Sequence, residues 1–278
     1  MTELPRTLVR RLPDVRFSLR SIWLSLTVAV IAILMFAPEL MAPADPFRLD
    51  AANRFHPPSF GHPFGTDEGG RDIFSRVIYG ARPSLGTALV VVGFAGIVGT
   101  TIGAIAGWLG GWVDRIVMKV VDVTLAFPYL VMAMAVAAAL GRGITAAMIA
   151  LASMWWPSYT RLVRGMVLSL KEDLHVQAAR TLGASSLQLL RWHVVPHTIP
   201  QLNARLTLDA GFAVIALTGL SFLGLGAQNP SPEWGLMIAN ARSFVFTAWW
   251  YGVFPGVAIF LTVLNFVGLG DLLAKEEA

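Results

Sequence analysis

The sequence of 278 residues contains no cysteine and few charged side chains. The absence of cysteine excludes disulfides and every metal or redox site that depends on a thiolate. Only 14% of the residues are charged, against about 25% in soluble domains. The sequence also lacks the G-x-x-x-x-G-K-[ST] phosphate loop, and no Ser-His-Asp set or carboxylate pair stands out. These absences argue against a soluble domain, a P-loop ATPase and the common hydrolytic enzymes.

Apolar side chains dominate what remains. The hydrophobic content is 55% and the mean hydropathy is +0.64, values that indicate a protein crossing the membrane several times. The formal net charge is +4 and the sequence pI is about 9.8. No basic run is interleaved with aromatic residues, so the positive charge is expected in cytoplasmic loops rather than on a nucleic-acid surface.

The apolar runs predict an all-α polytopic membrane protein with six transmembrane helices, because a bilayer span needs about 20 mainly apolar residues. Short turns at 109–115 and 141–143 join the second span to the third and the third to the fourth. A cleaved signal peptide is the alternative for the first run, but its length and the crowded prolines favour a span. The predicted spans cover residues 22–40, 85–108, 116–140, 144–162, 202–225 and 249–269.

The distribution of Lys and Arg predicts that both termini are cytoplasmic. With that orientation 14 of the 21 Lys and Arg residues fall inside and 7 outside, as the positive-inside rule requires. The resulting organisation is a cytoplasmic tail (1–21), a first helix (22–40), an external loop with an interfacial helix (41–84), a five-helix core (85–270) and a C-terminal tail (271–278).

Two local patterns predict contacts within the membrane. Arg205 and Asp209 lie one helical turn apart and are expected to form an ion pair. Small residues recur every four positions in the second span, and such a stripe lets two helix backbones approach closely in lipid. The stripe consists of Ala95, Gly99, Gly103, Gly107 and Gly111.

A long polar loop, residues 171–200, separates two of the apolar runs. It predicts two short amphipathic helices, broken at Gly183 and ended by Pro196. A docked partner protein is favoured over a surface of lipid headgroups. His193 and His197 are four residues apart, but Pro196 lies between them and no acidic or Cys ligand is near, so no metal site is expected.

Several motifs in the chain resemble those of ABC importer permeases, in the dipeptide, oligopeptide and nickel branch, and within it the second permease of each operon. The polar loop resembles the coupling loop of that family. The other matching segments are residues 65–67, 70–72, 75–76 and 79–82 before the second span, 221–226 and 234–235 after the fifth, and Trp250, Pro255, Gly256 and Asn265 in the last. The loop residues that carry the resemblance are Gln177, Ala178, Ala179, Gly183, Ala184, His193 and Pro196.

The resemblance implies a type I ABC importer permease fold with a cytoplasmic coupling loop, in a bacterial or archaeal inner membrane. It implies four kinds of contact: a homologous permease in a heterodimer, two ABC ATPase subunits that bind ATP and Mg, an external solute-binding protein, and membrane lipid. No cofactor is expected in this chain, which would not be an enzyme. Small peptides or nickel chelates are the implied solutes, and the substrate-binding residues are left unassigned.

The chain departs from the family pattern at three positions in the loop and spans, and its C-terminal tail is also atypical. Gln177 replaces the usual Glu that opens the loop motif, His197 replaces an Asn after the proline, and Leu217 stands where peptide-transporting members often carry Glu. The departure at Leu217 leaves the solute open, and Gln177 predicts a hydrogen bond in place of a charged contact to the ATPase.

A secondary transporter or channel is the main alternative. It would favour carboxylates at the membrane midplane, whereas Asp122 and Asp209 lie toward the cytoplasmic ends of their spans. No inverted repeat or broken midplane helix is clear in the sequence. An intramembrane enzyme is disfavoured because no reactive constellation is present.

Overall fold

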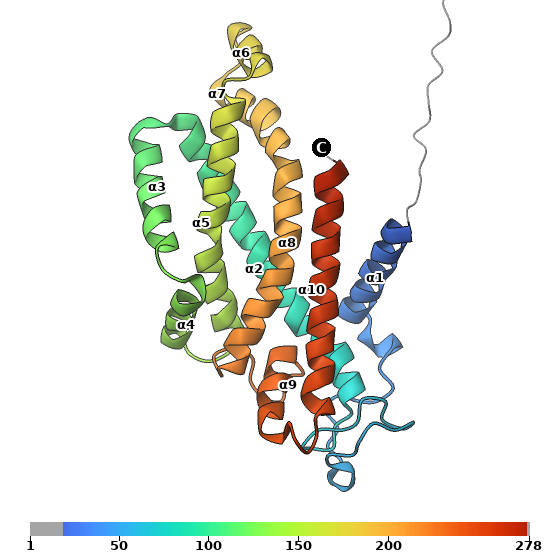
Figure 1. Cartoon of the computed structure of the whole chain (residues 1–278). Coiled ribbons are helices and arrows are strands. Elements are labelled where there is room, and N and C mark those ends of the chain that lie inside the picture. Colours follow the sequence, from blue (N-terminus) through green and yellow to red (C-terminus); the bar gives the residue numbers. More distant parts are fainter. Residues whose placement is uncertain (1–18, 277–278) are drawn as a thin grey trace, which may run out of the picture.

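The computed structural model describes residues 19–276, and the regular secondary structure within that range is helical. Four long helices run side by side as the core of the molecule (Figure 1). Helices α3 and α4 flank this core on one side and α1 flanks it on the other. The core helices are α2 (Ile73–Leu109), α5 (Ile144–Leu170), α8 (Val195–Phe222) and α10 (Trp250–Glu276), and the flanking ones are α1 (Leu19–Phe36), α3 (Gly111–Leu125) and α4 (Tyr129–Leu140).

The short elements gather at the two ends of the bundle (Figure 1). One end, here the loop end, carries α6 (Leu174–Thr181), α7 (Ser186–Leu189) and a π-helical turn (Leu190–Val194), and α10 ends toward it. The opposite end, here the far end, carries α9 (Trp234–Ala241) and the irregular segment 41–72. Three 3-10 turns complete the described elements: Pro38–Leu40, Ala51–Asn53 and Arg242–Phe244.

By length and composition, three stretches of described helix can cross a membrane: α2, the continuous stretch Ser186–Phe222, and α10. A fourth crossing results if the bent pair α3 and α4 counts as one span. The all-helical prediction is confirmed, while the number of six spans stays a prediction.

The predicted third span, 116–140, is not one helix. It breaks between Leu125 and Tyr129, and the two halves are bent by 89°. Pro128 explains the break, because its ring disfavours helical geometry at the preceding residue and it has no N–H to donate. The predicted turn 109–115 is also shorter than expected. Gly110 alone separates α2 from α3, with a φ of 65°.

The predicted interfacial helix is the first part of α2 and continues through Pro83 without a break. Asp72 caps it by accepting a hydrogen bond from the Ser75 backbone N–H at 2.8 Å. An interfacial helix would turn its polar side to lipid headgroups, but the polar side chains of Ser75 and Arg76 are both fully buried. These side chains pack into the segments of the far end.

The predicted small-residue stripe is confirmed as a packing face, and its partner is α5. A Cβ atom at Gly99 would lie 2.5 Å from the carbonyl oxygen of Trp156, and one at Gly103 would lie 2.5 Å from that of Thr160. Only glycine allows this approach of the two backbones. Gly111 does not belong to the face, because it begins α3 with a φ of 58° and contacts nothing there.

Candidate functional site

The first half of the polar loop ends in a sharp turn at Gly183. The Gly183 backbone N–H donates to the Arg180 carbonyl at 3.0 Å, and the Ala184 N–H donates to the Ala179 carbonyl at 3.1 Å. This pair of bonds is the Schellman arrangement, which closes a helix with a residue of positive φ. Gly183 has a φ of +90°, so the predicted break at this residue is confirmed.

The second half of the loop begins with a capping box. The Ser185 hydroxyl accepts from the Gln188 N–H, and the Gln188 side-chain oxygen accepts from the Ser185 N–H at 2.9 Å. The predicted stop at Pro196 is wrong. A π turn precedes it, with the Val195 N–H donating to the Leu190 carbonyl, and Pro196 occupies the first turn of α8. A missing N–H is tolerated there, so the helix runs on into the membrane.

The polar loop is anchored to the loop end of the core. Val176, Leu189 and Val194 are buried and belong to the main hydrophobic core. The Lys171 ammonium donates to the Trp108 carbonyl at 2.8 Å, and the Arg180 guanidinium lies over the Trp108 ring, 5.5 Å from its centroid. These contacts fix the loop relative to α2.

The outer face of the loop is both exposed and apolar. Its four large side chains are between 66% and 88% exposed. Large apolar side chains at a loop tip signal an interaction surface when they are grouped and held in place. The four are Leu174, Leu182, Leu187 and Trp192.

The residues predicted from the loop motif divide between this outer face and the core. Those on the surface are Gln177, Ala178, Gly183 and Pro196, and those partly buried are Ala179, Ala184 and His193. The Gln177 amide donates to the Glu172 carbonyl at 3.1 Å, which closes the start of α6 on itself. No group of three or more possible metal ligands is found in residues 19–276. His197 contacts the His175 ring instead, at 5.1 Å between centroids.

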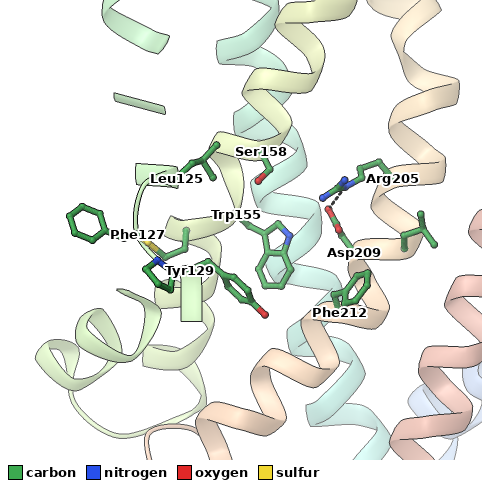
Figure 2. Close-up of a pocket in the computed structure, with 11 residues that line it drawn as sticks. Leu125, Phe127, Tyr129, Trp155, Ser158, Arg205, Asp209 and Phe212 are labelled. Atoms are coloured by element: carbon green, nitrogen blue, oxygen red, sulfur yellow. Dashed lines mark hydrogen bonds and ion pairs between the residues drawn. The ribbon is translucent and has the colours of Figure 1, made fainter. Parts of the chain in front are cut away.

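A cavity of about 560 Å³ opens between α5, α8 and the break that separates α3 from α4 (Figure 2). Its wall is largely aromatic and apolar, with three polar side chains, Ser158, Arg205 and Asp209. The sequence carries no separate signal for this cavity, because the cavity depends on the break at Pro128. The lining residues are Leu125, Phe127, Pro128, Tyr129, Met154, Trp155, Ser158, Arg205, Leu208, Asp209 and Phe212.

The predicted ion pair between Arg205 and Asp209 is confirmed and belongs to this cavity. The Arg205 Nε donates to an Asp209 carboxylate oxygen at 2.9 Å, and both side chains extend from α8 toward α5 (Figure 2). The Asp209 side chain is 4% exposed, whereas that of Arg205 is 50% exposed. The Asp209 carboxylate is therefore buried, whereas the Arg205 guanidinium is accessible from the cavity.

Two further ion pairs join α3 to α5. Arg164 binds the Asp114 carboxylate through two parallel hydrogen bonds of 2.5 and 2.6 Å. Arg161 binds Asp122 at 2.5 Å, with both side chains more than half exposed. Neither pair lines the cavity. They fix the position of α3 toward the loop end.

The sequence motifs outside the polar loop meet at the far end, although they are up to about 180 residues apart in the chain. The Trp234 indole N–H donates to the Val77 carbonyl at 2.8 Å, and that of Trp250 donates to the Thr66 carbonyl at 3.2 Å. A Cβ atom at Gly80 would lie 2.3 Å from the Pro232 carbonyl oxygen. These motifs therefore hold segment 41–72, α2, α9 and α10 together.

Two buried charged side chains, Arg76 and Glu233, also hold the segments of the far end together. Arg76 donates to the carbonyls of Pro46 and Ser231, at 3.0 and 3.3 Å, and its Nε lies 3.4 Å from the Asp67 carboxylate. Glu233 caps α9 by accepting from the N–H groups of Gly235 and Leu236. Burial raises the pKa of the Glu233 carboxyl above its usual value, against the opposing effect of these hydrogen bonds.

Comparison with known proteins identifies relatives along most of the chain. Residues 99–276 match the family described as binding-protein-dependent transport system inner membrane component. The probable D,D-dipeptide transport system permease protein DdpC of Escherichia coli strain K12 is 46% identical over 89% of this chain and 85% of its own length. The dipeptide transport system permease protein DppC of Alkalihalophilus pseudofirmus is 41% identical over 89% and 81%.

Two further matches extend the comparison. The glutathione transport system permease protein GsiD of Escherichia coli O6:K15:H31 is 42% identical over 89% of this chain and 84% of its own length. A solved structure of the MetNI methionine ABC transporter, in an inward-facing conformation, contains a chain similar in fold. The TM-score is 0.61 at 18% identity, over 73% of this chain and 96% of that one.

Proposed function

Because the chain belongs to the family of binding-protein-dependent transport system inner membrane components, we propose that it carries small peptides across the membrane. It is the permease component of an ABC importer and is not an enzyme, since ATP hydrolysis belongs to separate subunits of such transporters. In our proposal two ABC ATPase subunits bind the ATP and Mg, and a homologous permease completes a heterodimer around a shared path.

The polar loop is the proposed contact with the ATPase. The observation that carries this assignment is the exposed apolar face at its tip, with side chains such as Leu182 and Trp192 held on a loop anchored to the core. A rigid anchor lets movement of a docked partner reach α5 and α8, which the loop connects directly. Binding of nucleotide to one state of the ATPases would then shift the population of permease conformations.

The orientation follows from this assignment. The loop end faces the cytoplasm, α10 ends toward it, and the first turn of α1 is directed toward it (Figure 1). The far end then faces outward and receives the solute-binding protein. Its buried ion pairs and tight glycine contacts suit a platform that must keep its shape while the helices below it move.

The substrate class is proposed from the relatives. Their names specify D,D-dipeptides, dipeptides and glutathione, all short peptides with free carboxylates. A secondary transporter or channel is not favoured, although one helix is broken at the cavity. Irregular backbone at membrane depth is tolerated where it lines a cavity, whatever drives the transport, so the break alone does not indicate a secondary transporter.

The test is reconstitution of this chain in liposomes, alone and with its partner permease, ATPases and solute-binding protein. We expect dipeptide uptake and peptide-stimulated ATP hydrolysis only in the complete complex, and no hydrolysis by the isolated chain. ATP turnover by the purified chain alone, or peptide uptake without ATP, would contradict the proposal.

A further inference from the structure

We propose that the cavity between α5, α8 and the α3–α4 break binds the C-terminal carboxylate of a passing short peptide, and that Arg205 is the group that holds it. This inference rests on the proposed function and assigns a substrate contact within it. The residues and distances that carry it are those of the Arg205–Asp209 pair and the wall around it.

The hydrogen bonding of Arg205 leaves donors available. Its Nε donates to Asp209, and no other hydrogen bond of the guanidinium is found among the described residues. A guanidinium has five N–H groups, so one edge can stay with Asp209 while the other receives a second carboxylate. Asp209 in this arrangement orients the arginine and offsets the cost of its charge within the membrane.

Comparison with the other arginines separates this role from a structural one. Arg76 is fully buried, donates hydrogen bonds to two carbonyls from different segments and lies 3.4 Å from the Asp67 carboxylate, as expected of a group that holds segments together. Arg161 is as exposed as Arg205, but it bridges two helices and does not line the cavity. Arg205 alone among these three is half exposed, paired within its own helix and directed into a cavity.

The wall of the cavity suits the remainder of a short peptide. Tyr129, Trp155 and Phe212 surround the same space as the ion pair (Figure 2). A volume of about 560 Å³ lies within the usual range of about 300–1,000 Å³ for small-molecule sites. An aromatic wall with few polar groups accepts varied side chains, so a fixed charge that recognises the common carboxylate gives one contact to peptides of different sequence.

The test uses the absence of cysteine from this chain. A single cysteine replaces Ser158 on the cavity wall, and its reaction with a small thiol reagent is followed by mass spectrometry in the complete complex. Alanyl-alanine should protect this cysteine, and its C-terminal amide, which keeps the size and the ammonium group, should protect poorly. With Arg205→Gln, half-protection by alanyl-alanine should need a concentration about 10–100-fold higher, because an ionic hydrogen-bonded contact is lost.

Three further variants test whether the loss of protection comes from the Arg205 guanidinium itself. Arg161→Gln is the matched control and should leave protection unchanged, since that arginine has similar exposure but lies outside the cavity wall. Arg205→Gln combined with Asp209→Asn removes both charges, so that no buried carboxylate is left unpaired, and should lose protection as Arg205→Gln does. Arg205→Lys keeps the charge without the fork and should protect at an intermediate concentration.

The outcomes distinguish this inference from the proposed function. Equal protection by alanyl-alanine and its amide, or unchanged protection in both Arg205→Gln variants, would overturn the carboxylate site. A complex that imports alanyl-alanine but shows no protection would also overturn it, while the proposed function would stand. A complex that neither imports the peptide nor is protected by it would contradict the proposed function itself.

Discussion

Gly183 determines the direction of the polar loop through its backbone conformation alone. Its φ of +90° lies where residues with a Cβ are strained, and no atom lies within 4 Å of the Cβ position. A substitution there therefore tests conformation and not packing. The cost to a β-branched residue is about 1–2 kcal/mol.

We predict that Gly183→Val leaves the helices folded but redirects α7, and so lowers peptide uptake relative to ATP hydrolysis or prevents ATPase assembly. Gly183→Asn is the control, because asparagine tolerates positive φ far better than valine. Both are measured as uptake and hydrolysis in liposomes holding the complete complex. Normal uptake by the valine variant would show that the turn is not a fitted part of the coupling contact.

At the scale of elements, the close approach of α2 and α5 organises the core. The Gly103 backbone packs so closely on the Thr160 carbonyl that a Cβ atom at Gly103 would lie 2.5 Å from its oxygen. The Thr160 hydroxyl donates to the Gly99 carbonyl at 3.2 Å. The two helices therefore meet backbone to backbone, with a side-chain hydrogen bond between them. Such interfaces in lipid depend on packing and not on burial from water.

Gly103→Ala is expected to destabilise the protein by about 1–3 kcal/mol, because its Cβ would overpack the interface. The control on the same helix is Gly93→Ala, where nothing lies within 4 Å of the added atom. Helix propensity alone predicts that this control gains up to about 1 kcal/mol. Thermal unfolding of the purified chain in detergent compares the two, and equal midpoints would contradict the assigned interface.

Proline shows how far the elements were predictable from the sequence. Pro83, Pro157 and Pro255 all lie inside continuous helices, whereas Pro128 separates α3 from α4. Each of these residues has the same local effect on the backbone. Whether a proline breaks the helix depends on whether neighbouring helices provide hydrogen bonds to the backbone groups that it leaves unpaired. That depends on the tertiary structure and cannot be read from the local sequence.

The site was predictable to a similar degree. Gly183 and the spacing of Arg205 and Asp209 are local signals, and both were predicted. The cavity depends on the 89° bend and on three elements that meet there, so residues such as Tyr129 and Trp155 carried no separate signal. Helix α9 was not predicted, although Glu233 caps it by accepting from the backbone N–H groups of Gly235 and Leu236.

The two ends of the bundle are expected on opposite sides of the membrane. Ser186 at the loop end and Gln228 at the far end are both exposed, and the chain has no native cysteine. In intact cells an impermeant thiol reagent should label Gln228→Cys but not Ser186→Cys. Labelling of both after permeabilisation is the control for reactivity. Labelling of Ser186→Cys in intact cells would contradict the orientation.

If the polar loop joins this permease to an ATPase, a photo-crosslinking amino acid at Ala178 should capture that contact. Ala178 is exposed on α6, within the motif that resembles the family coupling loop. In the purified complete complex, illumination should join this chain to an ATPase subunit. The same amino acid at Gln228 should give no such product. An intact, transport-active complex in which Ala178 crosslinks only to lipid would contradict the account.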